Sequence, residues 1–276
     1  MLKKRVLTAL CLIPLVIAAI LWCGRLPFAW LSFEWLTGAI FIMAAWEWSR
    51  LAGFTTVLGR LLCLLLMFVV SILLLIAFER LGSRTSLRAG VFLLIPIFWL
   101  MALFAVVFYP KYTAFWKSRW VGIFSGCMLL VPTGFLLVAL QRTEPYLLLY
   151  IVALVCVCDS AAYFVGKRYG RTKLVPALSP GKTWEGVLGG LALSFVVVGI
   201  GYVLLKPKLS VPHWMLLSFI TMIFSIVGDL FESLFKRLRG LKDSGAILPG
   251  HGGILDRLDS LNAAVPLFSL GWMFLS

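Results

Sequence analysis

The chain has 276 residues, of which 62% are hydrophobic and only 13% are charged, and its formal net charge is +14. Its mean hydropathy of +1.04 lies far above the average of soluble globular proteins, which excludes a soluble domain and predicts a polytopic membrane protein. On a soluble protein this charge would suggest nucleic-acid binding. On a membrane protein it indicates orientation by cytoplasmic lysine and arginine, so we expect no nucleic-acid partner.

In chain order, nine apolar runs are long enough to cross a bilayer, so we expect an all-α fold with about nine transmembrane helices. These runs are 6–23, 27–48, 57–78, 88–109, 120–140, 146–166, 186–205, 213–230 and 260–275. The first run is too long for a signal peptide and is expected to be a retained helix. If the N-terminus is cytoplasmic, most of the 25 lysines and arginines fall in inner segments, which predicts this orientation and an outer C-terminus.

The two halves of the chain differ in their acidic residues. Residues 1–145 contain no aspartate, and Glu34 and Glu47 stand among aromatic residues, so we interpret this half as scaffold helices. All five aspartates lie in residues 146–276. This second half is therefore predicted to be the catalytic region, with its polar loops on the cytoplasmic side.

One polar run, from Gly228 to Leu261, interrupts the apolar C-terminal half. It contains four aspartates, a histidine and five cations, namely Asp229, Asp243, Asp256, Asp259, His251, Lys236, Arg237, Arg239, Lys242 and Arg257. Carboxylates can hold a hard divalent cation and the neighbouring cations can hold phosphate, which together indicate metal-assisted phosphoryl chemistry. The spacing predicts an amphipathic helix over 231–241 lying against the bilayer or a neighbour, then a glycine-rich turn, then an acidic helix start.

Two shorter segments carry further candidates. Asp159 falls inside the sixth apolar run, where an ionised side chain costs about 2.5–3.5 kcal/mol, so it is a functional candidate. The alternative is an interhelical hydrogen bond or a salt bridge to a lysine of the next loop. Ser179, Lys182 and Thr183 are expected to open the seventh helix, where free N–H groups and a lysine could hold phosphate. Ordinary capping is the alternative, and a P-loop is rejected because Pro176 stands at its first glycine position.

The run S-L-F-K-R-x4-K-D-S-G-x2-L-P-G-H-G-G-I-L-D-R-L-D, Ser233 to Asp259, closely resembles the signature of the phosphatidate cytidylyltransferases. The segments C-D-S-A-A-Y-F-V-G-K-R-Y-G and L-S-P-G-K-T-W-E-G are similar to two further blocks of that family. The resemblance implies an integral membrane enzyme that joins CTP and phosphatidic acid into CDP-diacylglycerol and releases pyrophosphate, with Mg²⁺ and with a second cation left open. It also implies the bacterial cytoplasmic (inner) membrane, an active site facing the cytoplasm, and leaves a homodimer open.

Roles can be assigned to the candidates on this basis. Asp229 and Asp256 are the first-choice metal ligands, Asp259 is third and Asp243 is the least certain. Lys236 and Arg237 join the first three as catalytic residues. The predicted substrate-binding residues are Asp159, Ser179, Lys182, Thr183, Ser233, Lys242, His251 and Arg257. His251 could act as a base, bind phosphate or stabilise its turn, and these three roles stay open.

Two other classes of function compete with this one. The first is another membrane transferase acting on a lipid phosphate, although the D-G-x2-A-R-x8-G-x3-D-x3-D run of CDP-alcohol phosphotransferases is absent from the sequence. The second is an ion or phosphate carrier, which would place charges near the midplane and often shows inverted repeats. Here the charges gather at one face and no repeat is visible.

Overall fold

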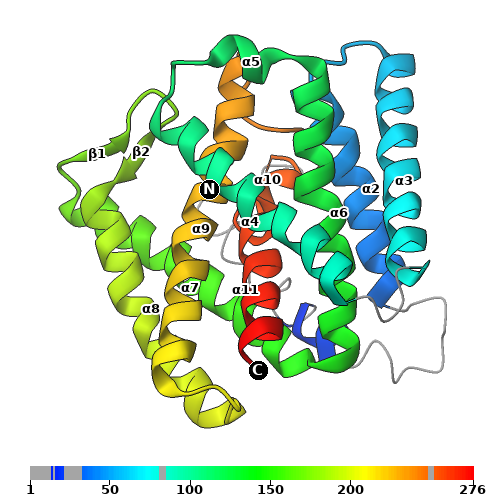
Figure 1. Ribbon diagram of the computed structural model, residues 1–276. Coiled ribbons are helices and arrows are strands. Elements are labelled where there is room, and N and C mark those ends of the chain that lie inside the picture. Colours follow the sequence, from blue (N-terminus) through cyan, green and yellow to red (C-terminus); the bar gives the residue numbers. More distant parts are fainter. Residues whose placement is uncertain (1–13, 15, 22–32, 81–84, 248–251) are drawn as a thin grey trace.

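The computed structural model describes residues 14, 16–21, 33–80, 85–247 and 252–276. The described chain is helical apart from one small antiparallel sheet of two strands (Figure 1). Its elements are α2 (Phe33–Leu51), α3 (Val57–Arg80), α4 (Thr85–Val107), α5 (Thr113–Lys117), α6 (Arg119–Thr143), α7 (Pro145–Tyr169), β1 (Lys173–Val175), β2 (Ser179–Thr183), α8 (Trp184–Leu205), α9 (Val211–Leu238), α10 (Leu255–Leu258) and α11 (Leu261–Leu275).

The expected apolar runs from 57–78 onward each coincide with a helix, and the run 27–48 overlaps α2. Five stretches of the described chain are long and apolar enough to cross a membrane: Arg119–Thr143, Pro145–Tyr169, Trp184–Leu205, Val211–Leu238 and Leu255–Leu275. A helical membrane protein is therefore confirmed. The number nine stays a prediction, because most of the first run lies outside the described residues.

Several helix ends follow from local sequence. Proline at the start of α7 fixes a helical φ at a position where no N–H partner is needed. The Thr183 Oγ1 accepts a hydrogen bond from the Gly186 N–H at 3.2 Å and so caps the start of α8. At the other end of α8, Lys206 takes a left-handed φ of 45°, which ends the helix.

Consecutive helices from α2 to α9 run up and down, so alternate connections gather at the same end of the molecule (Figure 1). We call the top end in Figure 1 the loop end; it carries the connections 52–56, 108–118 and 170–183 and the start of 239–254. Residue 144 and residues 206–210 connect helices at the opposite end. The chain from α9 then turns inward, because α10 and the start of α11 lie well below the loop end.

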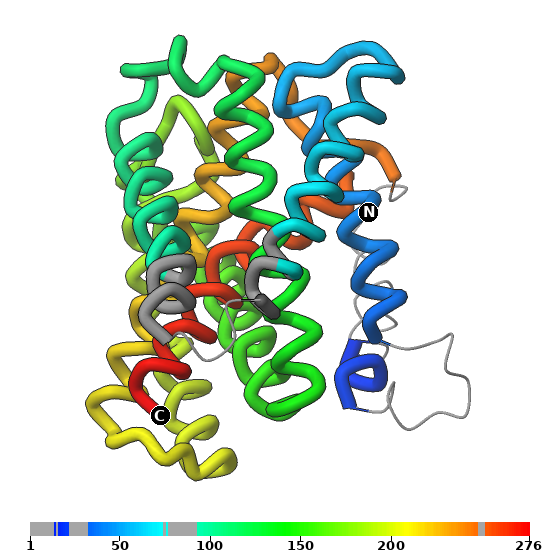
Figure 2. The backbone as a smooth tube through the Cα atoms, turned by 45° about the vertical axis from the view of Figure 1, so that its right-hand side comes forward, coloured from blue at the N-terminus to red at the C-terminus, as the bar shows by residue number. Residues whose placement is uncertain are grey.

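The two halves of the chain pack side by side. Helices α2 and α3 stand on one side, while α8 and α9 stand on the other (Figures 1 and 2). Helix α11 contacts α9 and α7 of its own half and also α6 and α4 of the first half. The division into a scaffold half and a catalytic half stays a prediction, but the last helix clearly joins them.

An aromatic cluster holds α9 against the first half. Phe235 of α9 lies 4.8 Å from Trp48 of α2, and Phe231 lies 5.4 Å from Trp116 of α5 and 5.6 Å from Phe98 of α4, measured between ring centroids. The two contacts of Phe231 are edge-to-face, and such pairs contribute about 0.5–1.5 kcal/mol each beyond their buried area. The cluster fixes the position of α9, which carries the charged candidates Asp229, Lys236 and Arg237.

The sequence predicted an apolar run over 213–230 and an amphipathic helix over 231–241 lying against the bilayer or a neighbour. In the structure both belong to one helix, α9, which is continuous from Val211 to Leu238 and packs its apolar face against neighbouring helices. Both of its faces are buried near the C-terminus, since Glu232 is 0% exposed and Lys236 8% exposed while Phe231 and Phe235 are 0% exposed. The polar face is buried because the chain after α9 packs against it, as the ion pair between Lys236 and Asp256 of α10 shows.

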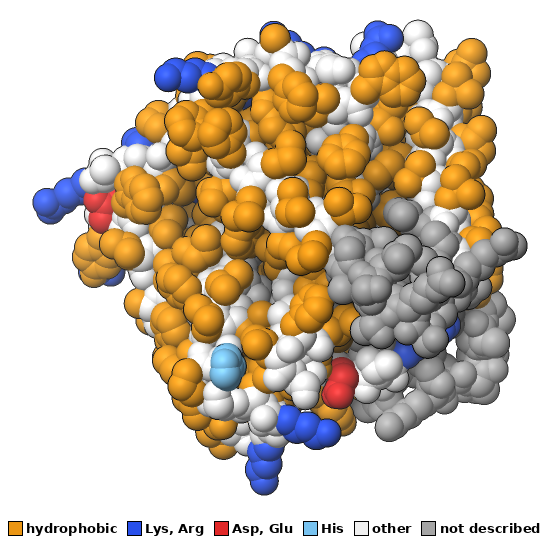
Figure 3. All heavy atoms as spheres, viewed as in Figure 1, with side chains coloured by type: hydrophobic (Ala, Val, Ile, Leu, Met, Phe, Trp, Pro, Cys, Tyr) orange, Lys and Arg blue, Asp and Glu red, His pale blue; other side chains and the backbone are white. Residues whose placement is uncertain are grey.

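Hydrophobic side chains cover most of the visible surface between the two ends, and lysines and arginines stand at the top, left and bottom margins (Figure 3). Exposed leucine, valine and phenylalanine on α3, α4 and α8 make up much of this apolar surface. A soluble monomer rarely exposes so large an apolar area, so these faces are typical of contact with lipid.

Candidate functional site

A cluster of charged side chains occupies the space where α7, β2, α9 and α10 meet below the loop end. We call it the charged cluster: Asp159, Lys182, Asp229, Glu232, Lys236, Asp256 and Asp259. Three ion pairs organise it. Lys182 Nζ lies 2.5 Å from Asp229 Oδ2, and Lys236 Nζ lies 3.1 Å from Glu232 Oε1 and 2.7 Å from Asp256 Oδ1. Charges this far from bulk water persist only when they are paired in this way.

Lys182 reaches the cluster from a β-hairpin. The sequence had predicted that it would lie at the start of a helix, and that prediction is wrong. Strand β2 pairs antiparallel with β1, with Val175 opposite Ser179 and Lys173 opposite Thr183. Burial alone would lower the pKa of the Lys182 ammonium, but the charge and hydrogen bond of Asp229, helped by Asp159 and Asp259, raise this pKa above its ordinary value. Lys182 is therefore a fixed positive charge at neutral pH.

Three aspartates gather around this lysine. The side chains of Asp229 and Asp259 lie close enough to interact electrostatically, and Asp159 interacts in the same way with Lys182 and Asp229. Gly228 allows this approach, because a Cβ at that position would collide with the backbone carbonyl of Asp259. Three carboxylates predicted from distant parts of the sequence thus come together here.

Asp256 is held separately, at the start of α10. Its Oδ1 accepts from Lys236 Nζ, and its Oδ2 accepts from the backbone N–H groups of Ser244 at 3.1 Å and Gly253 at 2.9 Å. Gly252 beside it adopts a left-handed φ of +80°, and a Cβ there would press on Asp256 Oδ2. Gly252 and Gly253 therefore lie directly against the Asp256 carboxylate.

The depth of the charged cluster follows from helix geometry. Asp229 precedes the last residue of α9, Leu238, by nine positions, which corresponds to about 14 Å along the axis at 1.5 Å per residue. The Asp229 and Lys182 side chains keep 26% and 24% exposure. The cluster is thus recessed within the helices, and these two side chains stay partly exposed.

The other predicted site residues lie at varied distances from the cluster. Arg237 donates from Nε to the Leu178 carbonyl at 3.0 Å and from Nη1 to the Leu241 carbonyl at 3.1 Å, so it ties the hairpin to the end of α9. Ser233 Oγ makes a long bond of 3.5 Å to Asp229 Oδ1. Ser179 begins β2, and Lys242, Asp243 and Arg257 are exposed. His251 lies outside the described residues.

No three His, Cys, Asp or Glu side chains of the described chain are grouped closely enough to hold a metal ion by themselves. Mg²⁺ does not require such a group, because it usually keeps several waters and binds one or two carboxylates together with substrate phosphates. The adjacent carboxylates of Asp229 and Asp259 fit that donor chemistry. Asp256 fits it less well, because the contacts described above already occupy both of its oxygens.

Sequence reasoning missed two acidic residues. Glu232 is fully buried, and its place four residues before Lys236 was a usable signal for an ion pair. Glu47, which had been assigned to the scaffold, is 2% exposed and contacts the segment that leads to Asp256. Nothing near Glu47 in the sequence indicated that contact.

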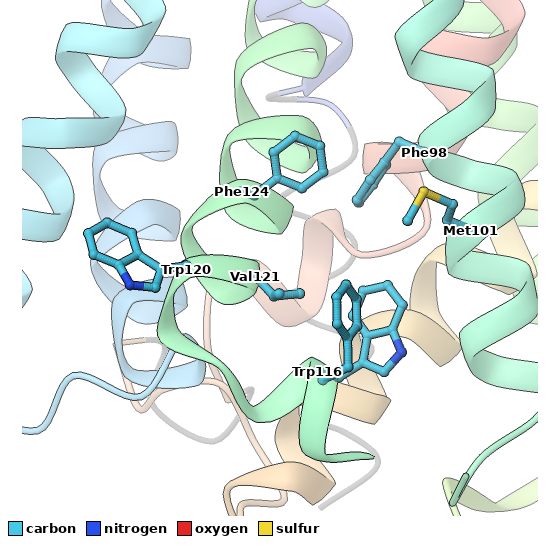
Figure 4. Close-up of a pocket in the computed structure, with 7 residues that line it drawn as sticks. Phe98, Met101, Trp116, Trp120, Val121 and Phe124 are labelled. Atoms are coloured by element: carbon cyan, nitrogen blue, oxygen red, sulfur yellow. The ribbon is translucent and has the colours of Figure 1, made fainter. Parts of the chain in front are cut away.

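A separate pocket of about 260 Å³ lies between α4, α5 and α6, with side chains of α4 and α6 facing each other across it (Figure 4). It is lined by Phe98, Met101, Phe115, Trp116, Trp120, Val121 and Phe124. The lining contains no charged side chain, so this pocket is not suited to binding a phosphate group.

Comparison with known proteins gives a consistent picture. A model of the cytidylyltransferase family matches residues 3–275. The chain is 39% identical over 272 residues to a phosphatidate cytidylyltransferase of Pseudomonas aeruginosa, covering 98% of this chain and 96% of that protein. It is 40% identical to one from Haemophilus influenzae, covering 99% of both chains, and 32% identical to one from Bacillus subtilis, covering 96% and 95%.

Membrane-length helices around a recessed cluster of lysines and carboxylates define the class, a helical integral membrane protein. The match over almost the whole length then fixes the relationship. The chain belongs to the cytidylyltransferase family.

Proposed function

We propose that this protein is a CTP:phosphatidate cytidylyltransferase, which joins CTP and phosphatidic acid into CDP-diacylglycerol and releases pyrophosphate in phospholipid synthesis. The observation that carries the proposal is the charged cluster, recessed below the loop end of a chain whose full-length relatives are named phosphatidate cytidylyltransferases. Two lysines and several carboxylates at such a place suit a reaction between a nucleoside triphosphate and a membrane lipid that carries a phosphate.

The reaction requires little proton chemistry. A phosphate oxygen of phosphatidic acid attacks the α-phosphorus of CTP, a new P–O bond forms, and the bond from that phosphorus to the bridging oxygen of pyrophosphate breaks. The attacking phosphate monoester is already anionic at pH 7, since its second pKa is about 6. The protein must therefore bring two anions together and stabilise a third as it leaves.

Lys182 and Lys236 are the cations placed for this work. Each is held by carboxylates that fix the direction of its ammonium group, Lys182 by Asp229 and Lys236 by Glu232 and Asp256. We expect the substrate phosphates to share these lysines. Arg237 contacts backbone carbonyls, so we expect it to act chiefly by holding the hairpin that presents Lys182.

Mg²⁺ is part of the proposal, with Asp229 and Asp259 as the residues that would hold it and Asp159 beside them. When bound, it would neutralise phosphate charge and align the reacting groups. A second cation, a homodimer, and the phosphate-binding roles of Ser179, Ser233, Lys242, His251 and Arg257 stay predictions.

We further propose that the protein lies in the bacterial cytoplasmic membrane with its loop end in the cytoplasm, where CTP is made. Charge supports this orientation. Lys111, Lys117, Lys167, Arg168, Arg171 and Lys173 lie in or beside the connections of the loop end, whereas Arg142, Lys206 and Lys208 lie near the opposite end. A carrier often shows inverted repeats, and no repeat is visible in this sequence, which argues against that class.

The direct test is a pyrophosphate-release assay with purified protein in detergent. We expect release that requires CTP, phosphatidic acid and Mg²⁺ together, with CDP-diacylglycerol formed in equal amount. Omitting each component in turn is the control. Release that continues without phosphatidic acid, or no release with all three present, would contradict the proposal.

A further inference from the structure

The buried carboxylate of Glu47 links the scaffold half to the charged cluster. Glu47 belongs to α2, yet its Oε2 accepts from the Ser244 hydroxyl at 3.0 Å and from the Leu255 backbone N–H at 2.9 Å. These two donors bracket the segment 244–255. Ser244 also donates its backbone N–H to Asp256, and Leu255 directly precedes Asp256. Glu47 is thus connected to Asp256 twice, once through Ser244 and once through Leu255.

The surroundings of Glu47 are shaped to admit its carboxylate. A Cβ at Gly245 would collide with Glu47 Oε1, and a Cβ at Gly253 would collide with Oε2 and with the Ser244 hydroxyl. Both glycines therefore leave room for the carboxylate between them. Glu47 Oε1 has no hydrogen-bond partner, so the known contacts of this side chain all run through Oε2.

A buried carboxylate is costly in the interior of a membrane protein, and a purely structural contact between helices is more cheaply made by apolar side chains. The position of Glu47 is explained if it holds the chain at both ends of the segment 244–255 in place. Ala246 and Ile247 within that segment are exposed, while Ser244 and Leu255 at its ends are 1% and 0% exposed. The two ends of the segment are buried, and both donate a hydrogen bond to Glu47.

We propose that Glu47 is a positioning residue for the active site, which fastens both ends of the segment 244–255 and thereby holds Asp256 against Lys236. The proposal rests on the proposed function for its effect on rate, but the contact itself can be tested without it. Because both bonds use one oxygen, the role needs an acceptor at Oε2 and does not need the negative charge.

Three variants separate these requirements. Glu47→Ala removes the acceptor, whereas Glu47→Gln keeps an oxygen that can occupy the Oε2 position. We expect Glu47→Ala to lower kcat by about 100-fold, the scale expected when a reacting group shifts by roughly 1 Å, and Glu47→Gln to retain most of the activity. Gly245→Ala should also lower kcat in the wild-type background but add little in Glu47→Ala, because the two changes disturb the same contact.

The structural readout is amide hydrogen exchange at Ser244 and Leu255 in the detergent-solubilised protein. Exchange should be faster in Glu47→Ala than in wild type and near wild type in Glu47→Gln. Equal loss of activity in Glu47→Gln and Glu47→Ala would overturn the proposal, since it would show that the charge is needed. Unchanged exchange in Glu47→Ala would overturn it as well. Absence of cytidylyltransferase activity in the wild type would refute the proposed function, while the exchange comparison would still decide the role of Glu47.

Discussion

Asp229 has the most varied contacts in the charged cluster. It forms an ion pair with Lys182 of the hairpin, interacts electrostatically with Asp259 after α10, and accepts a long hydrogen bond from Ser233 of its own helix. Each of these neighbours comes from a different stretch of sequence. The carboxylate therefore both fixes a lysine and offers oxygen to a cation. A substitution here should affect chemistry more than folding, because the amide of asparagine fits the same space.

We predict that Asp229→Asn lowers the rate of CTP-dependent pyrophosphate release by about 100-fold or more, as expected when a preorganised charge is removed from a phosphoryl-transfer site. Gel filtration in detergent and expression in membranes should stay close to wild type. The matched control is Glu144→Gln, the same change of carboxylate to amide at an exposed position of the opposite end. Turnover of Asp229→Asn at the wild-type rate would remove Asp229 from the site.

At this scale the sequence identified the right residue types but not their partners. Carboxylates and lysines in an apolar chain are conspicuous, so Asp159, Lys182, Asp229 and Asp259 could be selected without a structure. Which lysine meets which carboxylate depends on packing, since Lys182 and Asp229 are far apart in the chain. Asp256 was selected too, yet its contacts with backbone N–H groups could not be foreseen.

At the scale of the elements, one side chain at the end of α9, that of Arg239, binds the connections 52–56 and 108–118 of the loop end. Arg239 donates from Nε to the Leu51 carbonyl at 2.9 Å and from Nη2 to the carbonyls of Ala52 and Lys117, both at 2.9 Å. Gly53, with φ +101°, lies directly against this guanidinium. The planar fork of arginine is suited to several acceptors in fixed directions, whereas an ammonium group is not.

We predict that Arg239→Lys lowers the free energy of unfolding by about 1–3 kcal/mol, since hydrogen bonds from a charged donor are lost. The melting temperature in detergent should fall by several degrees. Arg142→Lys is the matched control, because its pair with Glu34 at 2.8 Å is exposed and contributes at most about 1 kcal/mol. Equal melting temperatures for Arg239→Lys and wild type would show that α9 is not held in this way.

Hydropathy predicted the long helices well, because their lengths match a bilayer and their residues are almost all apolar. It failed where polar residues are buried by tertiary contacts. Helix α9 continues through Glu232 and Lys236 because these side chains neutralise each other inside the protein. The strand Ser179–Thr183 was missed because it is short and lacks the alternation of apolar and polar residues that predicts a strand.

For the whole molecule, the arrangement of the helices could not be read from hydropathy, which says nothing about neighbours. The orientation in the membrane, by contrast, is a prediction from charge alone. We predict that a membrane-impermeant maleimide labels Lys208→Cys in intact cells but labels Lys173→Cys only after the membrane is opened. Both positions are exposed, and both variants would be made in a chain whose six cysteines are replaced by alanine. The reverse pattern of labelling would place the charged cluster outside the cell.

The link between Glu47 and Leu255 spans 208 positions of the chain. During synthesis at about 5–20 residues per second, Glu47 would be made about 10–40 s before its partners leave the ribosome. During that interval the Glu47 carboxylate would lie among the first helices without either hydrogen-bond donor. A chain truncated before residue 244 would lack both donors, so we expect it to leave this buried carboxylate without its hydrogen bonds.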